Sequence, residues 1–406
     1  MMNNTKSLFK TLPIFVPRVM DTTISDLGTK FPALLMDSHH IEWRKGVEGK
    51  IAGLTDVFIV DPVTVHLLYP DARKKKNFAK LPYPADIKPE DLYSNAADRL
   101  EKVIKPAIND QQSKNGSVII APSFYAEDTD DVKFPVNLSL LSETLRYLEQ
   151  EHIDKPIFAN ICIGKTALHR NSVISYMANL YRDEFKEKLA GYIISVNDFD
   201  AEKADLDQLL GIAALVFKLS NGNEVFVKHM GGFGEVLCAI GASGFSSSLD
   251  GGEIFSVKNF EQRTNGFGRK GGWTYVSEIF DHVNDTELKK IGYTCSCPHC
   301  GGSLPASQKD KKLHYLHQRL EVMKSLQPLN RAQRIDFVIT KLEKAISLVV
   351  SYRRQYAVSL SPIYLQNWLA TLKDAKDWVH ETDQDPEELN QLLEDLKGNT
   401  DDKSST

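Results

Sequence analysis

Short apolar runs recur along roughly the first 250 residues of this 406-residue chain, separated by stretches that can form helices. Such continuous runs are typical of parallel strands that are buried on both faces. Eight strands that alternate with helices predict an α/β fold of the (β/α)8 barrel type. Connecting helices are expected at 138–151, 170–189 and 235–242. The eight runs are Leu12–Val19, Ala33–Asp37, Val57–Asp61, Val118–Tyr125, Ile157–Gly164, Gly191–Val196, Glu224–Met230 and Gly244–Leu249.

One further apolar run leaves the strand number open. Ala213–Leu219 also has the composition of a strand. Asn221-Gly222 follows it and is a frequent two-residue hairpin turn. A ninth strand, paired through this turn with the seventh, is therefore an alternative for this part of the chain.

The last third of the chain has a different pattern. Arg334–Tyr352 and Pro362–Val379 carry apolar residues at helical spacing, which indicates packing helices. From Asp383 onward the chain is acidic and polar, so we expect it to be disordered. We predict a barrel catalytic domain at 1–290, a zinc-binding and helical subdomain at 291–382, and a disordered tail at 383–406.

Three of the five cysteines lie within six residues, at Cys295, Cys297 and Cys300. This spacing is typical of a zinc site, in which a nearby histidine completes a tetrahedron. We expect His317 to be the fourth ligand, with His314 as the alternative, because both lie on one face of the segment that follows. Four protein ligands leave no open coordination position, so the Zn²⁺ is predicted to be structural rather than catalytic.

The composition indicates the cellular compartment and the kinds of partner to expect. Five cysteines, and no signal-like or membrane-length apolar stretch, argue against a disulfide framework. They favour a cytoplasmic protein that does not bind a membrane. The formal net charge of −5 excludes wholesale electrostatic attraction to nucleic acid, so any such binding requires local basic patches.

Polar residues follow or end most of the predicted strands, where a (β/α)8 barrel carries its chemistry. Asp61 ends the third run, and Asp250 follows the eighth. Two carboxylates at one barrel mouth could divide the roles of nucleophile and general acid/base between them. The alternative is that both are strand-end caps, since Asp-Pro and Asp-Gly are common turn formers. The other polar residues at or after strand ends are Asp37, Ser38, His39, His40, Ser123, Tyr125, Cys162, Ser195, Asn197 and His229.

The segment Tyr293–Cys300, Tyr-Thr-Cys-Ser-Cys-Pro-His-Cys, resembles the zinc motif of the tRNA-guanine transglycosylases. In that family a histidine in a Leu-His-Asn helix follows, and Leu316-His317-Gln318 is similar. Ile14–Pro17 and Ala33–His40 resemble the first two strands of the family. The resemblance covers residues 12 to 350. It implies a (β/α)8 barrel with a structural zinc site.

The resemblance also implies an activity. The family exchanges a guanine in nucleic acid for a 7-deazaguanine through a covalent aspartyl–sugar intermediate. Strand order implies that Asp250 is the nucleophile and Asp61 the general acid/base; local sequence makes Asp37 the alternative to Asp61. The target nucleotide would leave its stack to reach the barrel mouth. The residues expected to contact its base are Ser123, Phe124, Tyr125, Cys162 and His229.

This sequence differs from the family pattern at positions that would contact the substrate. Cys162 stands where the family has a base-reading glutamine, and Pro62-Val63-Thr64 follows Asp61 in place of Ser-Gly-Gly. These changes favour DNA slightly over tRNA as the polymer. A second hypothesis is a catalytically silent barrel that binds nucleic acid or pairs with an active paralogue, and a third is an enzyme acting on a small molecule. The family resemblance also implies a homodimer built near the zinc region.

Overall fold

The computed structural model describes most of the chain. The described residues are 8–20, 22–27, 30–44, 46–69, 77–83, 87, 89–249, 254–257 and 272–382. Asp250 and the predicted disordered tail from Asp383 lie outside them.

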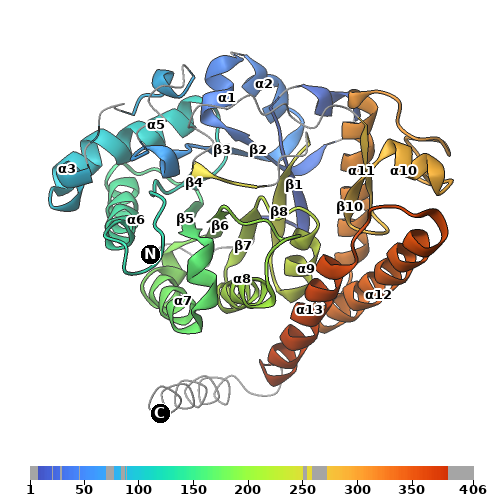
Figure 1. Ribbon diagram of the computed structural model, residues 1–406. Coiled ribbons are helices and arrows are strands. Elements are labelled where there is room, and N and C mark those ends of the chain that lie inside the picture. Colours follow the sequence, from blue (N-terminus) through green and yellow to red (C-terminus); the bar gives the residue numbers. More distant parts are fainter. Residues whose placement is uncertain are drawn as a thin grey trace, which may run out of the picture.

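Eight parallel strands form a nearly closed barrel at the centre of the molecule (Figure 1). Their order around the sheet is β3-β2-β1-β8-β7-β6-β5-β4. The two ends of this sheet meet where the backbone N–H of Ser117 donates to the carbonyl of Phe58 at 2.7 Å. The predicted (β/α)8 architecture is confirmed. The strands are β1 (Ile14–Arg18), β2 (Phe31–Asp37), β3 (Thr55–Asp61), β4 (Ile119–Ile120), β5 (Ile157–Gly164), β6 (Gly191–Asn197), β7 (Glu224–Lys228) and β8 (Gly244–Ser248).

Alternate side chains of each strand point into the barrel and outward to the helices. In β1, Ile14 and Val16 belong to the apolar cluster inside the barrel, whereas Phe15 packs in the outer core. Both faces are therefore apolar, which explains the continuous runs in the sequence. Toward the carboxyl ends of the strands the inward positions become polar. We call this end the barrel mouth; its inward side chains include Arg18, Asp37, Asp61, Cys162, Ser195, Lys228 and Ser246.

Helices surround the barrel (Figure 1). The three predicted connectors correspond to α6, α7 and α9, so these predictions are confirmed. A π-helical turn, Leu100–Ile104, joins α4 to α5. The helices between β2 and β8 are α1 (Ser38–Trp43), α2 (Val47–Ala52), α3 (Pro89–Tyr93), α4 (Ala96–Arg99), α5 (Lys105–Ser113), α6 (Lys133–Gln150), α7 (Asn171–Phe185), α8 (Leu206–Leu219) and α9 (Phe233–Ile240).

The alternative of a ninth strand at Ala213–Leu219 is wrong, because this run forms the second half of α8. That helix begins after Asp205, whose carboxylate accepts a hydrogen bond from the backbone N–H of Gln208. Gly222, with φ of +100°, makes the turn after the helix. The turn therefore leads from a helix into β7 and does not close a hairpin.

α11 (Gln308–Leu326) takes the place of the eighth barrel helix, against β1 and β8. Its start is fixed by a capping box, in which Ser307 and Asp310 bond to each other's backbone N–H groups. The amide of Gln327 donates to the carbonyl of Pro13 at 3.1 Å, which ties the end of the helix to the start of β1. α11 is therefore part of the barrel wall.

The remaining elements extend this side of the molecule (Figure 1). Two long helices confirm the helical pattern of the last third: α12 packs on α9, and α13 packs on α8 and α12. None of the helices in the described part of the chain has the length and apolar character needed to span a bilayer. These elements are β9 (Trp273–Val276), β10 (Asp281–Asn284), α10 (Asp285–Lys290), α12 (Arg331–Tyr356) and α13 (Ile363–Thr382).

Candidate functional site

An ion pair crosses the barrel mouth. Nζ of Lys228, the last residue of β7, lies 2.6 Å from Oδ2 of Asp61, the last residue of β3. These strands are four positions apart in the eight-stranded order and therefore face each other across the barrel. Both side chains are buried. Pairing offsets the high cost of removing each charge from water, so either charge alone would be strongly unfavourable.

A second ion pair lies beside the first. Asp37 is the register partner of Asp61 on the neighbouring strand, so both carboxylates belong to one layer of the mouth. Nε of Arg18, at the end of β1, donates to Oδ1 of Asp37 at 3.1 Å, and Nη2 donates to Oδ2. Burial opposes ionisation of Asp37, but the charge and hydrogen bonds of Arg18 outweigh it and hold its pKa well below the usual value. Asp37 is therefore a carboxylate at neutral pH.

Two histidines and a phenylalanine cover the mouth. His66 lies in a short 3-10 turn after β3, and His229 follows β7 with φ of +63°. The ring of Phe255 lies 5.3 Å from the ring of His66 and 5.5 Å from that of His229. Burial lowers the pKa of both histidines well below the usual value, so both rings are neutral at pH 7.

The chain that carries Phe255 is bound to the end of β6. The carbonyl of Phe255 accepts from the backbone N–H of Asp198 at 2.8 Å. Oδ1 of Asn197 accepts from the backbone N–H of Val257, also at 2.8 Å. Phe255 and Val257 pack on Cys162, and burial raises the pKa of its thiol to about 12. Cys162 is therefore protonated and acts as an apolar side chain rather than a nucleophile.

Several polar atoms buried inside the barrel lack a hydrogen-bond partner among the described residues. Burying such a group without a partner costs about 1–3 kcal/mol. Natural proteins keep these groups where a water or a ligand satisfies them. The mouth therefore has the character of a binding site. The atoms are Oγ of Ser123, Nδ2 and Oδ1 of Asn160, Oγ of Ser195, Nδ1 of His229 and Oγ of Ser246.

The structure brings together Asp37, Asp61, Cys162 and His229 of the predicted site residues at the mouth. Ser123 is buried at the edge of this region, where its carbonyl accepts from Oγ1 of Thr64 at 3.0 Å. The predicted nucleophile, Asp250, lies outside the described residues.

The two predicted aromatic contacts differ. Phe124 is fully buried in the outer core, and both its backbone groups bond to the side-chain amide of Asn137. It has no face free to stack on a base. Tyr125 packs at the edge of the mouth beside Cys162, and its hydroxyl donates to the carboxylate of Glu127.

The residues of the mouth that were not predicted as site residues include Arg18, His66, Asn160, Lys228 and Phe255. For two of them the sequence holds a usable pattern. Arg18 and Lys228 are single basic residues at the end of an apolar run, where a charge can only be kept by a partner inside the barrel.

The cysteine cluster forms a second site on the outer wall of the barrel. Nδ1 of His314 lies 3.3 Å from Sγ of Cys295, 3.5 Å from that of Cys297 and 3.3 Å from that of Cys300. Ligands of a tetrahedral Zn²⁺ with ordinary bond lengths are about 3.5 Å apart. The four side chains could therefore bind a metal such as zinc.

The fourth member of this cluster is His314, so the preference for His317 requires correction. His317 lies one turn further along α11, where its ring stacks on that of His299 at 5.7 Å. Nε2 of His314 is 2.7 Å from the carbonyl of Tyr275. A proton on Nε2 donates to this carbonyl and leaves Nδ1 as the ligand atom.

A group of buried charges and rings joins this cluster to the barrel, and we call it the α11 junction. Oε1 of Glu235, in α9, accepts from Arg319 at 2.6 Å, and its Oε2 accepts from Lys341 at 2.7 Å. The guanidinium of Arg319 lies over the rings of Tyr275 and Tyr315, at 4.3 and 5.0 Å. The hydroxyl of Tyr315 lies 2.5 Å from that of Ser247 in β8. The metal-binding segment is thus fastened to the strand that precedes Asp250.

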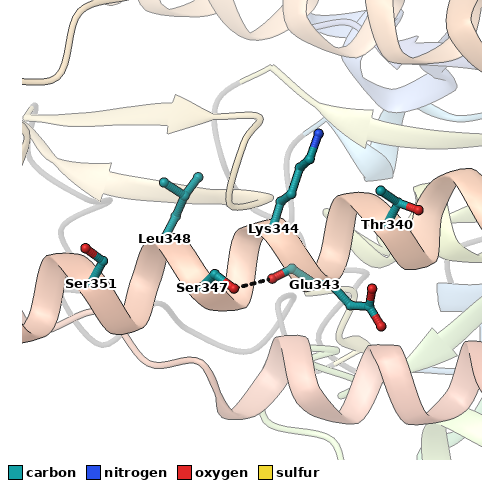
Figure 2. A pocket seen from close by; sticks show the side chains of 6 residues that line it. All are labelled: Thr340, Glu343, Lys344, Ser347, Leu348 and Ser351. Carbon is teal, nitrogen blue, oxygen red and sulfur yellow. Dashed lines mark hydrogen bonds between the residues drawn. The ribbon is translucent and has the colours of Figure 1, made fainter.

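A shallow groove on α12 lies away from these groups (Figure 2). All its lining residues come from this one helix, and Figure 2 shows their side chains pointing in different directions. The hydroxyl of Ser347 donates to the carbonyl of Glu343 within the helix, at 2.9 Å. A groove lined by a single helix does not bring together side chains from different elements, so the barrel mouth is the better candidate site. The lining residues are Thr340, Glu343, Lys344, Ser347, Leu348 and Ser351.

No protein-family model matches the chain, and no curated protein sequence matches it.

Proposed function

We propose that this protein is a guanine transglycosylase that exchanges guanine in nucleic acid for a 7-deazaguanine. The observation that carries the proposal is the carboxylate of Asp61, buried in the barrel mouth at the end of β3. β8 ends at the same mouth, and Asp250 follows it in the sequence. The unpartnered polar atoms of the mouth support binding of a polar, planar base.

In the proposed reaction a carboxylate oxygen of Asp250 attacks C1′ of the target nucleoside. The bond from C1′ to N9 of guanine breaks, and its electron pair leaves with the guanine, which takes up a proton. A carboxylate suits this step because it stabilises the oxocarbenium-like transition state before it bonds to the sugar. Asp61 then takes the N9 proton of the incoming 7-deazaguanine. That nitrogen attacks C1′, and the carboxylate of Asp250 leaves.

Lys228 and Arg18 have roles in this proposal. Lys228 holds the carboxylate of Asp61 from across the barrel, at 2.6 Å. Arg18 holds Asp37 in the same layer. Fixed cations of this kind pre-organise the mouth without reorganisation during the reaction. Asp37, which is already bound by Arg18, remains the alternative to Asp61 as the acid/base.

The Cys3His cluster would hold a structural Zn²⁺ in this proposal. Three thiolates and one imidazole fill a tetrahedral zinc ion, so no position remains for a substrate. Burial raises the pKa of the Cys295 and Cys300 thiols, and a bound cation would offset this by stabilising the thiolates. Its task would be to fix α11 to the barrel beside β8.

The polymer is proposed to be DNA ahead of tRNA, since the base-reading positions depart from the tRNA-modifying pattern. The test is release of labelled guanine from DNA or from tRNA in the presence of a 7-deazaguanine. We expect Asp250→Ala to abolish release, and Asp61→Asn to lower it about 10²–10⁴-fold because the general base is lost. Asp56→Asn changes an exposed aspartate at the other end of β3 and should leave release unchanged. Release from neither polymer would contradict the proposal.

One observation favours a second function, a catalytically silent barrel that binds nucleic acid or an active paralogue. Asp61 is already paired with Lys228, and Phe255 lies over the mouth between two histidines. Such a barrel would bind nucleic acid without forming a covalent adduct. A denaturation-resistant adduct that needs Asp250 rules this function out; tight binding with no adduct supports it.

A further inference from the structure

Three potential metal ligands converge at the rim of the barrel mouth, away from the cysteine cluster. Asp37 ends β2, and His39 and His40 lie in the first turn of α1. One ligand atom from each, a carboxylate oxygen or a ring nitrogen, lies within 4.8 Å of the other two. The rings of the two histidines are stacked, with centroids 4.0 Å apart.

The distance between Asp37 and His40 fits two ligands of one ion better than a direct contact. Nε2 of His40 lies 3.8 Å from Oδ2 of Asp37, too far for a hydrogen bond. Two ligands about 2.1 Å from a transition-metal ion are held roughly 3.5 Å apart. Nδ1 of His40 is also buried and makes no hydrogen bond to any described residue. No hydrogen bond from Nδ1 to a described residue therefore fixes this ring.

Asp37 can bind a metal while it is paired with Arg18, whose Nε and Nη2 donate to its two carboxylate oxygens. The pair leaves capacity for a metal, because a carboxylate has about four lone-pair sites and Arg18 uses two. Ligating carboxylates commonly have such a hydrogen-bonding partner, which orients them.

We propose that Asp37, His39 and His40 form a second metal site, for a divalent transition-metal ion, at the rim of the barrel mouth. One oxygen and two nitrogen ligands suit zinc, cobalt or iron more than calcium or magnesium. Three protein ligands leave open positions for water or a substrate oxygen, in contrast to the four ligands of the cysteine cluster. This site does not depend on the proposed transglycosylase activity.

Cobalt binding to the metal-free protein tests the proposal, because thiolate ligands give Co²⁺ an absorption that nitrogen and oxygen ligands do not. We expect the wild type to bind two Co²⁺ per chain, one with the thiolate absorption and one without. His40→Gln should lose only the second ion, and Cys297→Ser should lose the thiolate absorption. Circular dichroism checks that each variant is folded.

A matched control is His169→Asn. Nε2 of His169 lies 3.6 Å from Oδ2 of Asp205 on the exposed surface, and among the described residues no third potential ligand joins them in a cluster. This variant should bind two ions. Saturation of the wild type at one Co²⁺ with thiolate absorption would overturn the proposal without any variant. It would also be overturned if the second ion remained, with unchanged affinity, in folded His40→Gln and Asp37→Asn proteins.

Discussion

The α11 junction and the barrel mouth are both buried and polar, yet their groups are paired to different extents. At the junction each carboxylate oxygen of Glu235 has its own cation, and the Arg319 guanidinium lies over two tyrosine rings. At the mouth, hydroxyl and amide groups of Ser195, Ser246 and Asn160 have no partner among the described residues. Paired groups hold elements together, whereas unpartnered ones are kept for what they bind. The junction thus has the properties of a structural region, and the mouth those of a functional one.

The largest expected effect comes from removing the metal at the cysteine cluster. Structural zinc contributes about 10–16 kcal/mol in small zinc-binding peptides. A part of that, several kcal/mol, should be lost here, because α11 then loses its attachment to Cys295, Cys297 and Cys300. Denaturant unfolding of the zinc-loaded wild type, with and without a chelator, measures it. Equal stabilities would contradict a structural role, and Cys297→Ser should behave as the chelated protein does.

The next effect is at Glu235. Glu235→Ala leaves Arg319 and Lys341 without their shared carboxylate, and unpairing buried charges costs about 3–5 kcal/mol. Chemical denaturation should show this loss. Glu343→Ala removes an exposed carboxylate that is 3.6 Å from Lys373, and exposed pairs contribute at most about 1 kcal/mol. If the two variants lost the same stability, the junction would not be the structural region described above.

The mouth should make stability depend on pH. Burial lowers the pKa of His66 and His229 in the folded protein, so between pH 6.5 and the lowered values the unfolded chain binds protons that the folded chain does not. Stability should therefore fall as pH drops below about 6.5, by roughly 1 kcal/mol per pH unit for each ring.

Unfolding of the wild type and of His229→Phe across this pH range measures the effect. The variant should lose part of the slope, whereas His152→Asn, at an exposed position, should keep it. A slope that is the same in His229→Phe as in the wild type would exclude His229 as one of its sources.

The smallest effects compare two hydroxyls. Tyr315→Phe at the junction removes a contact with Ser247 at 2.5 Å and should cost about 1 kcal/mol. Ser246→Ala at the mouth removes a hydroxyl with no partner among the described residues, so stability should stay the same or rise slightly. Thermal unfolding distinguishes them. Equal losses in the two variants would show that the mouth is paired after all.

The strands could be predicted from the sequence because they are buried on both faces. The alternative that the sequence left open at Ala213–Leu219, a strand where the structure has a helix, shows the limit of that rule. Both structures can be wholly apolar when buried, so composition alone did not separate α8 from a strand. The N-cap at Asp205, at the start of the helix, was the missing information.

The wrong choice of the histidine ligand and the failure to predict the cations of the mouth have a common cause. His314 and His317 lie one turn apart on α11, and only the packing of that helix decides which faces the cysteines. Lys228 meets Asp61 over 167 residues of sequence, because barrel closure places β7 opposite β3. Neither the histidine that faces the cysteines nor the partner of Asp61 can be read from the neighbouring sequence. The polar residues at the strand ends predicted where the mouth lies. Contacts between residues far apart in the sequence determine which side chains lie in it.

The place of α11 against β1 has a consequence for how the chain folds. Gln327 bonds to the carbonyl of Pro13 over a separation of 314 residues, so the first strand is synthesised long before the helix that covers it. Contacts of such sequence separation form late and slowly. The outer face of β1, including Phe15, therefore stays exposed to solvent until α11 has been synthesised. Chains that end before residue 308 lack this helix and should aggregate.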